Sequence, residues 1–172
     1  MRRVLTPVVK YWVCKRAPTA CAETMEVLGG NGYCEDAPLA RRLRESPLNS
    51  IWEGSGNIMC LDVLRALARE PRTLEALAAL LGRAAGRDAR YDRYRDTLLA
   101  ELAQTDDGEL RARDLTQRIA LAAQASLLLA HGPEPSCAAF LASRIAAGPP
   151  AAFGTLPRGS DCDALTARVL AP

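Results

Sequence analysis

Apolar residues recur at helical spacing through most of the chain, and this periodicity constrains the possible folds more than any other feature. In VVKYWVCKRAPTACAETMEVL, residues 8–28, apolar side chains return every three or four positions. No stretch alternates convincingly between apolar and polar residues, as a half-buried strand would. Alanine and leucine dominate the composition, and both stabilise helices. The sequence therefore predicts an all-α chain.

Prolines and glycines mark the ends of the expected helices. Thr6-Pro7 predicts that a helix has its N-cap at Thr6 and its first residue at Pro7. Pro18 predicts a kink in this helix, and Gly29-Gly30 predicts its end. Because the first 70 residues carry a dense motif and the rest does not, we expect domains at 1–70 and 71–172. Further helices are expected at residues 39–46, 55–69, 74–81, 88–104, 109–131, 136–147 and 161–170, with a turn at Thr105–Gly108 and a Pro/Gly loop at 146–160.

Charge and cysteine content argue against several classes of function. A net charge of +2 provides no strong field toward nucleic acid or membrane. The six cysteines form no Cys-x-x-Cys pair and His131 is the single histidine, so we expect no metal site. No signal peptide and no membrane-length apolar run is evident, which favours a cytoplasmic protein with reduced thiols.

The stretch IWEGSGN, Ile51 to Asn57, places the carboxylate of Glu53 between a tryptophan and two glycines, with no basic residue close by in sequence. An apolar pocket would strip water from a carboxylate and make it a usable general base. Glycines allow close approach of a flat ligand, and Ser55 and Asn57 offer polar groups ahead of a helix. Taken alone, a glutamate near a helix start is more often a capping or dipole partner.

The wider segment MEVLGGNGYCEDAPLARRLRESPLNSIWEGSGNIMCLDVLRAL, Met25 to Leu67, resembles the C-terminal helical domain of the acyl-CoA dehydrogenases. The LGGNGY turn, RRLRE, SPLNSIWEGSGN and CLDVLR stand in the family's order and spacing. Ser55, the residue that follows Glu53-Gly54, resembles the residue at this position in the AidB-like, alkylation-response branch of the family. The resemblance implies a C-terminal helical bundle at 1–70 and a helical extension at 71–172. The family's N-terminal helical and middle β domains are expected to be absent from this chain.

The resemblance also implies roles for individual residues. Glu53 matches the catalytic base, which takes the α-proton of an acyl-CoA while the β-hydride passes to FAD. Gly29 and Gly30 match a turn that approaches the FAD adenosine of a neighbouring subunit, so we expect a homo-oligomer, a tetramer in the family. Glu26 stands where many of these enzymes carry glutamine, and we expect that contact to differ. The implied cofactor-lining residues are Ile51, Trp52, Gly54, Ser55, Gly56, Asn57 and Leu61.

Rows of arginine raise a second function, duplex DNA binding through phosphates and independent of base sequence. The resemblance implies such binding for the C-terminal helical region of the AidB-like branch. The row of Arg83, Arg87 and Arg90 would form a single helical face only if a helix crosses Gly86. The alternative is a solvated helix face with pairs such as Asp92 with Arg95. The expected DNA contacts are Arg65, Arg69, Arg83, Arg87 and Arg90.

Three interpretations stay open on sequence alone. The chain is part of an FAD-dependent acyl-CoA dehydrogenase-like oxidoreductase, or a DNA-binding protection module, or an inactive truncated remnant. We do not expect catalysis by the chain alone, because the family's other domains hold the flavin ring and much of the acyl pocket.

Overall fold

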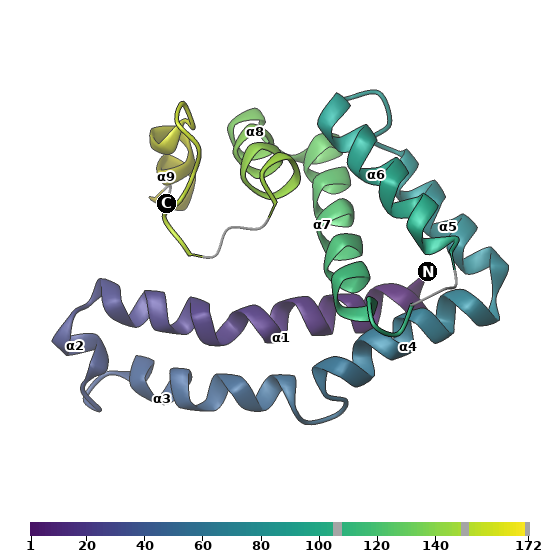
Figure 1. Cartoon of the computed structure of the whole chain (residues 1–172). Coiled ribbons are helices and arrows are strands. Elements are labelled where there is room, and N and C mark those ends of the chain that lie inside the picture. Colours follow the sequence, from purple (N-terminus) through teal and green to yellow (C-terminus); the bar gives the residue numbers. More distant parts are fainter. Residues whose placement is uncertain (105–107, 149–151, 171–172) are drawn as a thin grey trace. The chain divides into compact units, whose positions relative to one another are not determined.

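The computed structural model describes residues 1–104, 108–148 and 152–170, and helices are the only regular secondary structure in these ranges (Figure 1). The all-α prediction is confirmed for these residues, which contain no strand. The elements in chain order are α1 (Arg2–Val27), α2 (Gly30–Tyr33), α3 (Pro38–Glu45), the 3₁₀ segment η1 (Ser46–Ser50), α4 (Gly56–Arg69), α5 (Pro71–Gly82), α6 (Ala89–Leu102), α7 (Ala112–His131), α8 (Glu134–Phe140), the π-helical segment η2 (Leu141–Ala146) and α9 (Cys162–Leu170).

These residues form two compact units. Unit 1 contains residues 1–73 and 108–120, and unit 2 contains the other described residues. The first turns of α7 thus belong to unit 1, although they lie beyond residue 70, where the sequence predicted a domain boundary. That boundary stays a prediction. Residues 105–107 of the predicted turn and 149–151 of the predicted loop lie outside the described residues.

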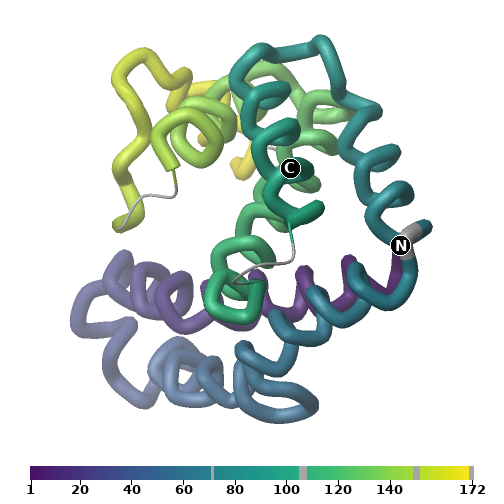
Figure 2. The backbone as a smooth tube through the Cα atoms, turned by 45° about the vertical axis from the view of Figure 1, so that its right-hand side comes forward, coloured from purple at the N-terminus to yellow at the C-terminus, as the bar shows by residue number. Residues whose placement is uncertain are grey.

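Unit 1 is built on one long helix and the chain that returns along it. From the far end of α1 the chain turns through α2 and comes back as α3, η1 and α4, and each of these elements contacts α1 (Figures 1 and 2). Val4 and Val8 of α1 and Cys60 and Val63 of α4 are at most 1% exposed. Fully burying a valine contributes about 1.5–3 kcal/mol, so this apolar seam fixes α1 against α4.

The start of α1 differs from the prediction. The helix begins at Arg2, so the assignment of Thr6-Pro7 as its first residues is wrong. Val4 and Val8 lie one helical turn apart, and both are buried. Burying that pair favours a helix that runs through Pro7, although the proline lacks the N–H that would bond to the preceding turn. Pro18 also lies inside the helix.

The end of α1 is confirmed at the glycine pair. The helix stops at Val27, and Gly29 has a φ of 57°, in the left-handed region that glycine enters without steric penalty. Gly32 packs directly on the end of α1. A Cβ at this position would lie 2.2 Å from the backbone oxygen of Met25. The LGGNGY turn therefore depends on two of its three glycines, one for backbone angle and one for space.

Unit 2 contains α5 from Leu74 onward, α6, the end of α7, α8, η2 and α9, around a core that includes the fully buried Tyr91. The Tyr91 hydroxyl donates to the carbonyl of Leu81 at 2.8 Å, which ties α6 to α5. Asp88 caps α6 by accepting from the backbone N–H groups of Arg90 and Tyr91. The guanidinium of Arg90, paired with the same carboxylate, is the main cause that lowers the pKa of Asp88 to about 2.

The described helices include none with the length and apolar character needed to cross a bilayer. Within the same ranges, histidine, cysteine and acidic side chains do not gather in groups that could hold a metal ion.

Replacing Gly32 by alanine should destabilise the chain by about 1–3 kcal/mol, because the new methyl group forces the end of α1 away from α2. Gly30→Ala is the matched control: its Cβ would meet nothing within 4 Å, so we expect a change within about 0.5 kcal/mol. Urea unfolding of both variants measures the difference. Equal destabilisation by the two alanines would contradict the packing described for Gly32.

Candidate functional site

The IWEGSGN segment forms an irregular turn between η1 and α4. The N–H groups of Ile51 and Trp52 donate to the carbonyl of Leu48 at 2.9 and 3.1 Å. Glu53 then has a φ of 51° and Gly54 a φ of 107°. Among the described residues, Glu53 is the only non-glycine with a positive φ. A left-handed conformation costs an L-residue roughly 1–2 kcal/mol, so packing around the turn must impose it.

Glu53 is exposed and lines an open pocket of about 640 Å³ between α1 and α4. In sequence Glu53 has no basic neighbour, but in the fold three basic residues of α1 line the same pocket. Because the Glu53 side chain is exposed, this chain by itself does not remove water from the carboxylate. The pocket is lined by Arg2, Arg3, Thr6, Pro7, Lys10, Glu53, Met59 and Asp62.

Two of the basic residues already have partners. The Lys10 ammonium donates to the carbonyl of Trp52 at 2.9 Å and also to the carbonyl of Gly54. Arg3 forms a bidentate ion pair with Asp62 of α4. The hydrogen bonds from Arg3 are the main cause that lowers the pKa of Asp62, with smaller contributions from the charges of Arg65 and Arg69. Sequence reasoning missed these contacts of Lys10 and Arg3, because α1 and the turn lie far apart along the chain.

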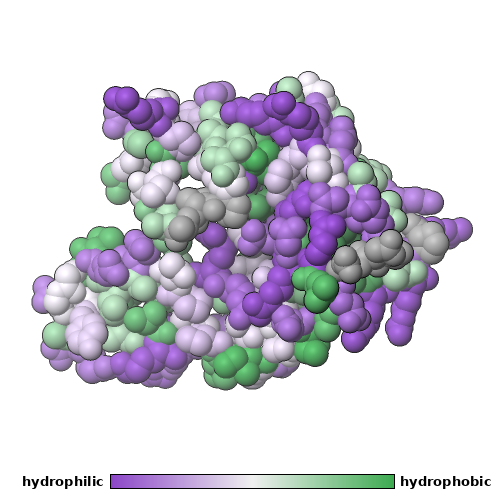
Figure 3. All heavy atoms as spheres, in the orientation of Figure 1, coloured by the Kyte–Doolittle hydropathy of each residue, from purple (hydrophilic) through white to green (hydrophobic). Residues whose placement is uncertain are grey.

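Two of the predicted cofactor-lining residues, Ile51 and Trp52, expose apolar side chains, as does Ile58 close by in sequence. Ile51 is 63% exposed, Trp52 55% and Ile58, on the first turn of α4, 49%. Figure 3 shows apolar side chains reaching the surface along the lower edge of unit 1. Large apolar side chains that lie together at a surface mark a place where a ligand or another protein packs. Asn57 is also exposed, Gly54, Ser55 and Leu61 are half-buried, and Gly56 is buried.

The structure does not bring Gly29 and Gly30 to this site. Both glycines are exposed at the turn after α1, whereas the Glu53 turn contacts α1 at Lys10. The part of α1 between Lys10 and Val27 is about 26 Å long, at roughly 1.5 Å per residue. Within one copy of the chain, the two predicted cofactor segments are therefore separate.

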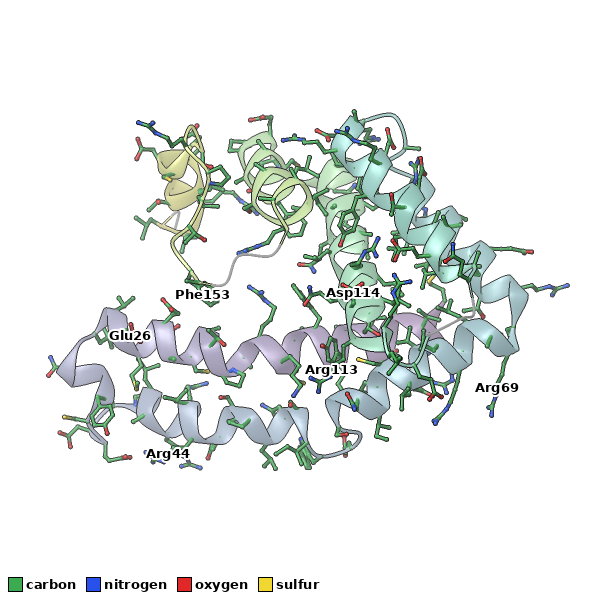
Figure 4. The ribbon with its side chains drawn as sticks, in the orientation of Figure 1. Glu26, Arg44, Arg69, Arg113, Asp114 and Phe153 are labelled. Atoms are coloured by element: carbon green, nitrogen blue, oxygen red, sulfur yellow. The ribbon has the colours of Figure 1, made fainter. Side chains whose placement is uncertain are left out.

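Arg113 reaches the cofactor segment from the start of α7. Its Nε donates to the Oδ1 of Asn57 at 2.7 Å, and Figure 4 shows it beside α1. Its charge also influences Cys60 and Tyr11, two groups whose pKa burial raises. No local sequence signal identifies Arg113, because it lies 56 positions from its partner.

The arginines predicted to contact DNA fall into two groups. Arg65 and Arg69 are exposed on α4, and Figure 4 shows Arg69 extending away from the helix. The other group does not form the expected helical face, because no helix crosses Gly86: α5 ends at Gly82, α6 begins at Ala89, and Gly86 has a φ of 76°.

In that second group, Arg83 is exposed, and the other two arginines hold specific partners. Arg87 donates to the carbonyl of Leu129, and Arg90 pairs with Asp88 at 2.7 Å. The pair that we expected on a solvated face, Asp92 with Arg95, is present at 2.8 Å.

Comparisons with known proteins identify the family to which this segment is similar. Residues 1–68 match the family model described as "Acyl-CoA dehydrogenase, C-terminal domain". Residues 1–68 therefore belong to the C-terminal helical domain of the acyl-CoA dehydrogenase family. It is similar to the putative acyl-CoA dehydrogenase AidB of Escherichia coli (strain K12), with 41% identity over 138 residues. That alignment covers 80% of this chain and 25% of the relative.

Two nematode matches extend the comparison. Acyl-CoA dehydrogenase family member 11 of Caenorhabditis elegans is 31% identical over 157 residues, again 80% of this chain and 25% of the relative. The crystal structure of Caenorhabditis elegans ACDH-11 in complex with C11-CoA superposes with a TM-score of 0.61 and 28% identity. The superposed residues make up 78% of this chain and 26% of the ACDH-11 chain. The chain thus spans about a quarter of the length of these relatives.

Cys60, inside the predicted cofactor-lining segment, should resist thiol reagents in the folded chain. It is completely buried, and burial raises the pKa of its thiol, so little reactive thiolate forms at neutral pH. Cys34 and Cys162 are exposed and provide the internal comparison. Labelling with a chromogenic disulfide at pH 7.5, followed by mass mapping, should modify these two first and Cys60 only on unfolding. Modification of Cys60 at the rate of Cys34 would contradict its burial.

Proposed function

We propose that this chain provides the catalytic base and part of the flavin-binding surface of an FAD-dependent, AidB-like acyl-CoA dehydrogenase. The observation that carries the proposal is Glu53, held in a left-handed turn at the mouth of an open pocket. The turn lies in the segment that matches the family's C-terminal domain. A residue kept in a costly conformation at a pocket is a reasonable place to look for function.

The residues around the turn fit a flavin. The exposed side chains of Ile51, Trp52 and Ile58 offer an apolar surface to a flat ring system. Ser55 precedes α4 without using its hydroxyl as a cap, so this hydroxyl is available for a ligand. The Oδ1 of Asn57 is bonded to Arg113, which leaves the amide N–H₂ to donate. These groups would hold the flavin, which when bound accepts a hydride from the β-carbon of the acyl chain.

Glu53 would perform the proton transfer. Its carboxylate takes the α-proton of the thioester, and the C–H electron pair becomes part of the new double bond of a 2-enoyl thioester. A thioester substrate is supported by the C11-CoA in the complex of the relative ACDH-11. Because Glu53 is exposed here, covering of the pocket by flavin and substrate would supply the desolvation that strengthens a base.

The proposal is tested in a chimera in which this chain replaces the matching quarter of the Escherichia coli relative. With C11-CoA added, Glu53→Gln should slow flavin bleaching by about 10²–10⁴-fold, while FAD stays bound, because only the proton acceptor is removed. Glu75→Gln, at an exposed position of α5, is the control and should bleach at the unmodified rate. Undiminished bleaching by Glu53→Gln would rule out its role as the base.

We also propose sequence-independent binding of duplex DNA through α4. This second function is supported by the exposed Arg65 and Arg69, one turn apart at the end of that helix. The neighbouring acid Asp62 is engaged by Arg3, so it neutralises these arginines less. Homo-oligomerisation is proposed as well, supported by the exposed apolar residues of unit 1. A cytoplasmic location stays a prediction.

Arg65→Ala should weaken DNA binding to the same extent for unrelated duplex sequences and lower the slope of log affinity against log salt by about 1, because one phosphate contact is lost. Fluorescence anisotropy over a range of salt concentrations measures both quantities. Arg42→Ala, which removes an exposed arginine from α3, is the matched control. A loss restricted to one duplex sequence, or an equal loss for Arg42→Ala, would exclude the phosphate contact assigned to Arg65.

A further inference from the structure

We propose that Lys10 is a positioning residue that holds Glu53 in place by clamping the peptide groups on both sides of it. The inference rests on the proposed function, in which Glu53 is the base. The Lys10 ammonium donates to the carbonyl of Trp52 at 2.9 Å and to the carbonyl of Gly54. These two carbonyls flank the Glu53 residue, so one ammonium fixes the orientation of the backbone before and after it.

The turn needs such a clamp because the backbone bonds to Leu48 secure only its first part, and the carbonyls of Trp52 and Gly54 accept no bond from a backbone N–H of the described residues. Glu53 and Gly54 both have positive φ, so the chain leaves the helical path between the end of η1 at Ser50 and the start of α4 at Gly56. The carbonyls of Trp52 and Gly54 point to the ammonium instead of to a helical N–H. A lysine provides three N–H donors, so it can bond both carbonyls and keep one donor for the pocket.

Lys10 can act in this way because α1 holds it rigidly. Pro7 and Val8, in the turn of helix before it, are buried, and Lys10 itself is half-buried. The other charged groups in the pocket are Arg2, Arg3, Asp62 and Glu53. Asp62 is paired with Arg3, so it does not draw the ammonium away from the turn. The lysine therefore links the α1–α4 packing to the conformation of Glu53.

The test is amide hydrogen exchange of the full chain, followed by ¹H–¹⁵N NMR without flavin or thioester. The reporters are the N–H groups of Ile51 and Trp52, which bond to Leu48 within the turn. Lys10→Met should speed their exchange about 10-fold to 100-fold, because a charge-assisted clamp is lost. Lys10→Arg keeps positive donors and should restore much of the protection. Arg42→Met removes an exposed charge from α3 and should leave both amides unchanged.

Two results would overturn the inference: unchanged exchange of Ile51 and Trp52 in Lys10→Met, or equal acceleration along α1 and α4, which would indicate a general loss of stability. Failure to restore protection in Lys10→Arg would also count against a donor clamp. Because these measurements need no catalysis, they remain informative if Glu53→Gln still bleaches flavin. In that case the base assignment fails, while the clamp is judged on exchange alone.

Discussion

The packing of α1 against α4 is the interaction on which the candidate site depends. Val4 and Val8 on one helix and Cys60 and Val63 on the other exclude water along the seam. This seam sets the register between the helices, and thereby places Lys10 against a turn more than 40 positions away in sequence. The Arg3–Asp62 pair lies along the same two helices, but at exposed positions such pairs contribute little. Apolar burial holds the helices, and polar contacts then shape the turn.

The site is polar on one side and apolar on the other. Lys10, Arg3 and Asp62 line the pocket with groups that are mostly paired to each other or to the backbone. Ile51 and Trp52, by contrast, are more than half exposed. An open pocket beside uncovered apolar side chains is the arrangement expected of a surface that a cofactor or another segment completes. It also explains why Glu53 is exposed here, although the chemistry proposed for it requires a dry environment.

Much of the fold follows from local sequence, and the site only in part. Glycine ended α1 where predicted, at Gly29-Gly30, because the left-handed backbone angle there is a local property. The start of α1 was mispredicted, since burial of Val4 and Val8 outweighed the usual place of a proline. The motif around Glu53 was visible in sequence. The contacts of Lys10 and Arg113 were not, because only tertiary packing brings them to the turn.

The most direct measurement is a titration of the ¹⁵N-labelled chain with FAD, followed by ¹H–¹⁵N NMR, which detects weak as well as tight binding. If the exposed face of the IWEGSGN turn forms part of a flavin site, saturable shifts should gather in residues 51–61 and leave the amides of α6 in place. Shifts that gather in α6, or a spectrum unchanged at millimolar FAD, would contradict a flavin surface at this turn.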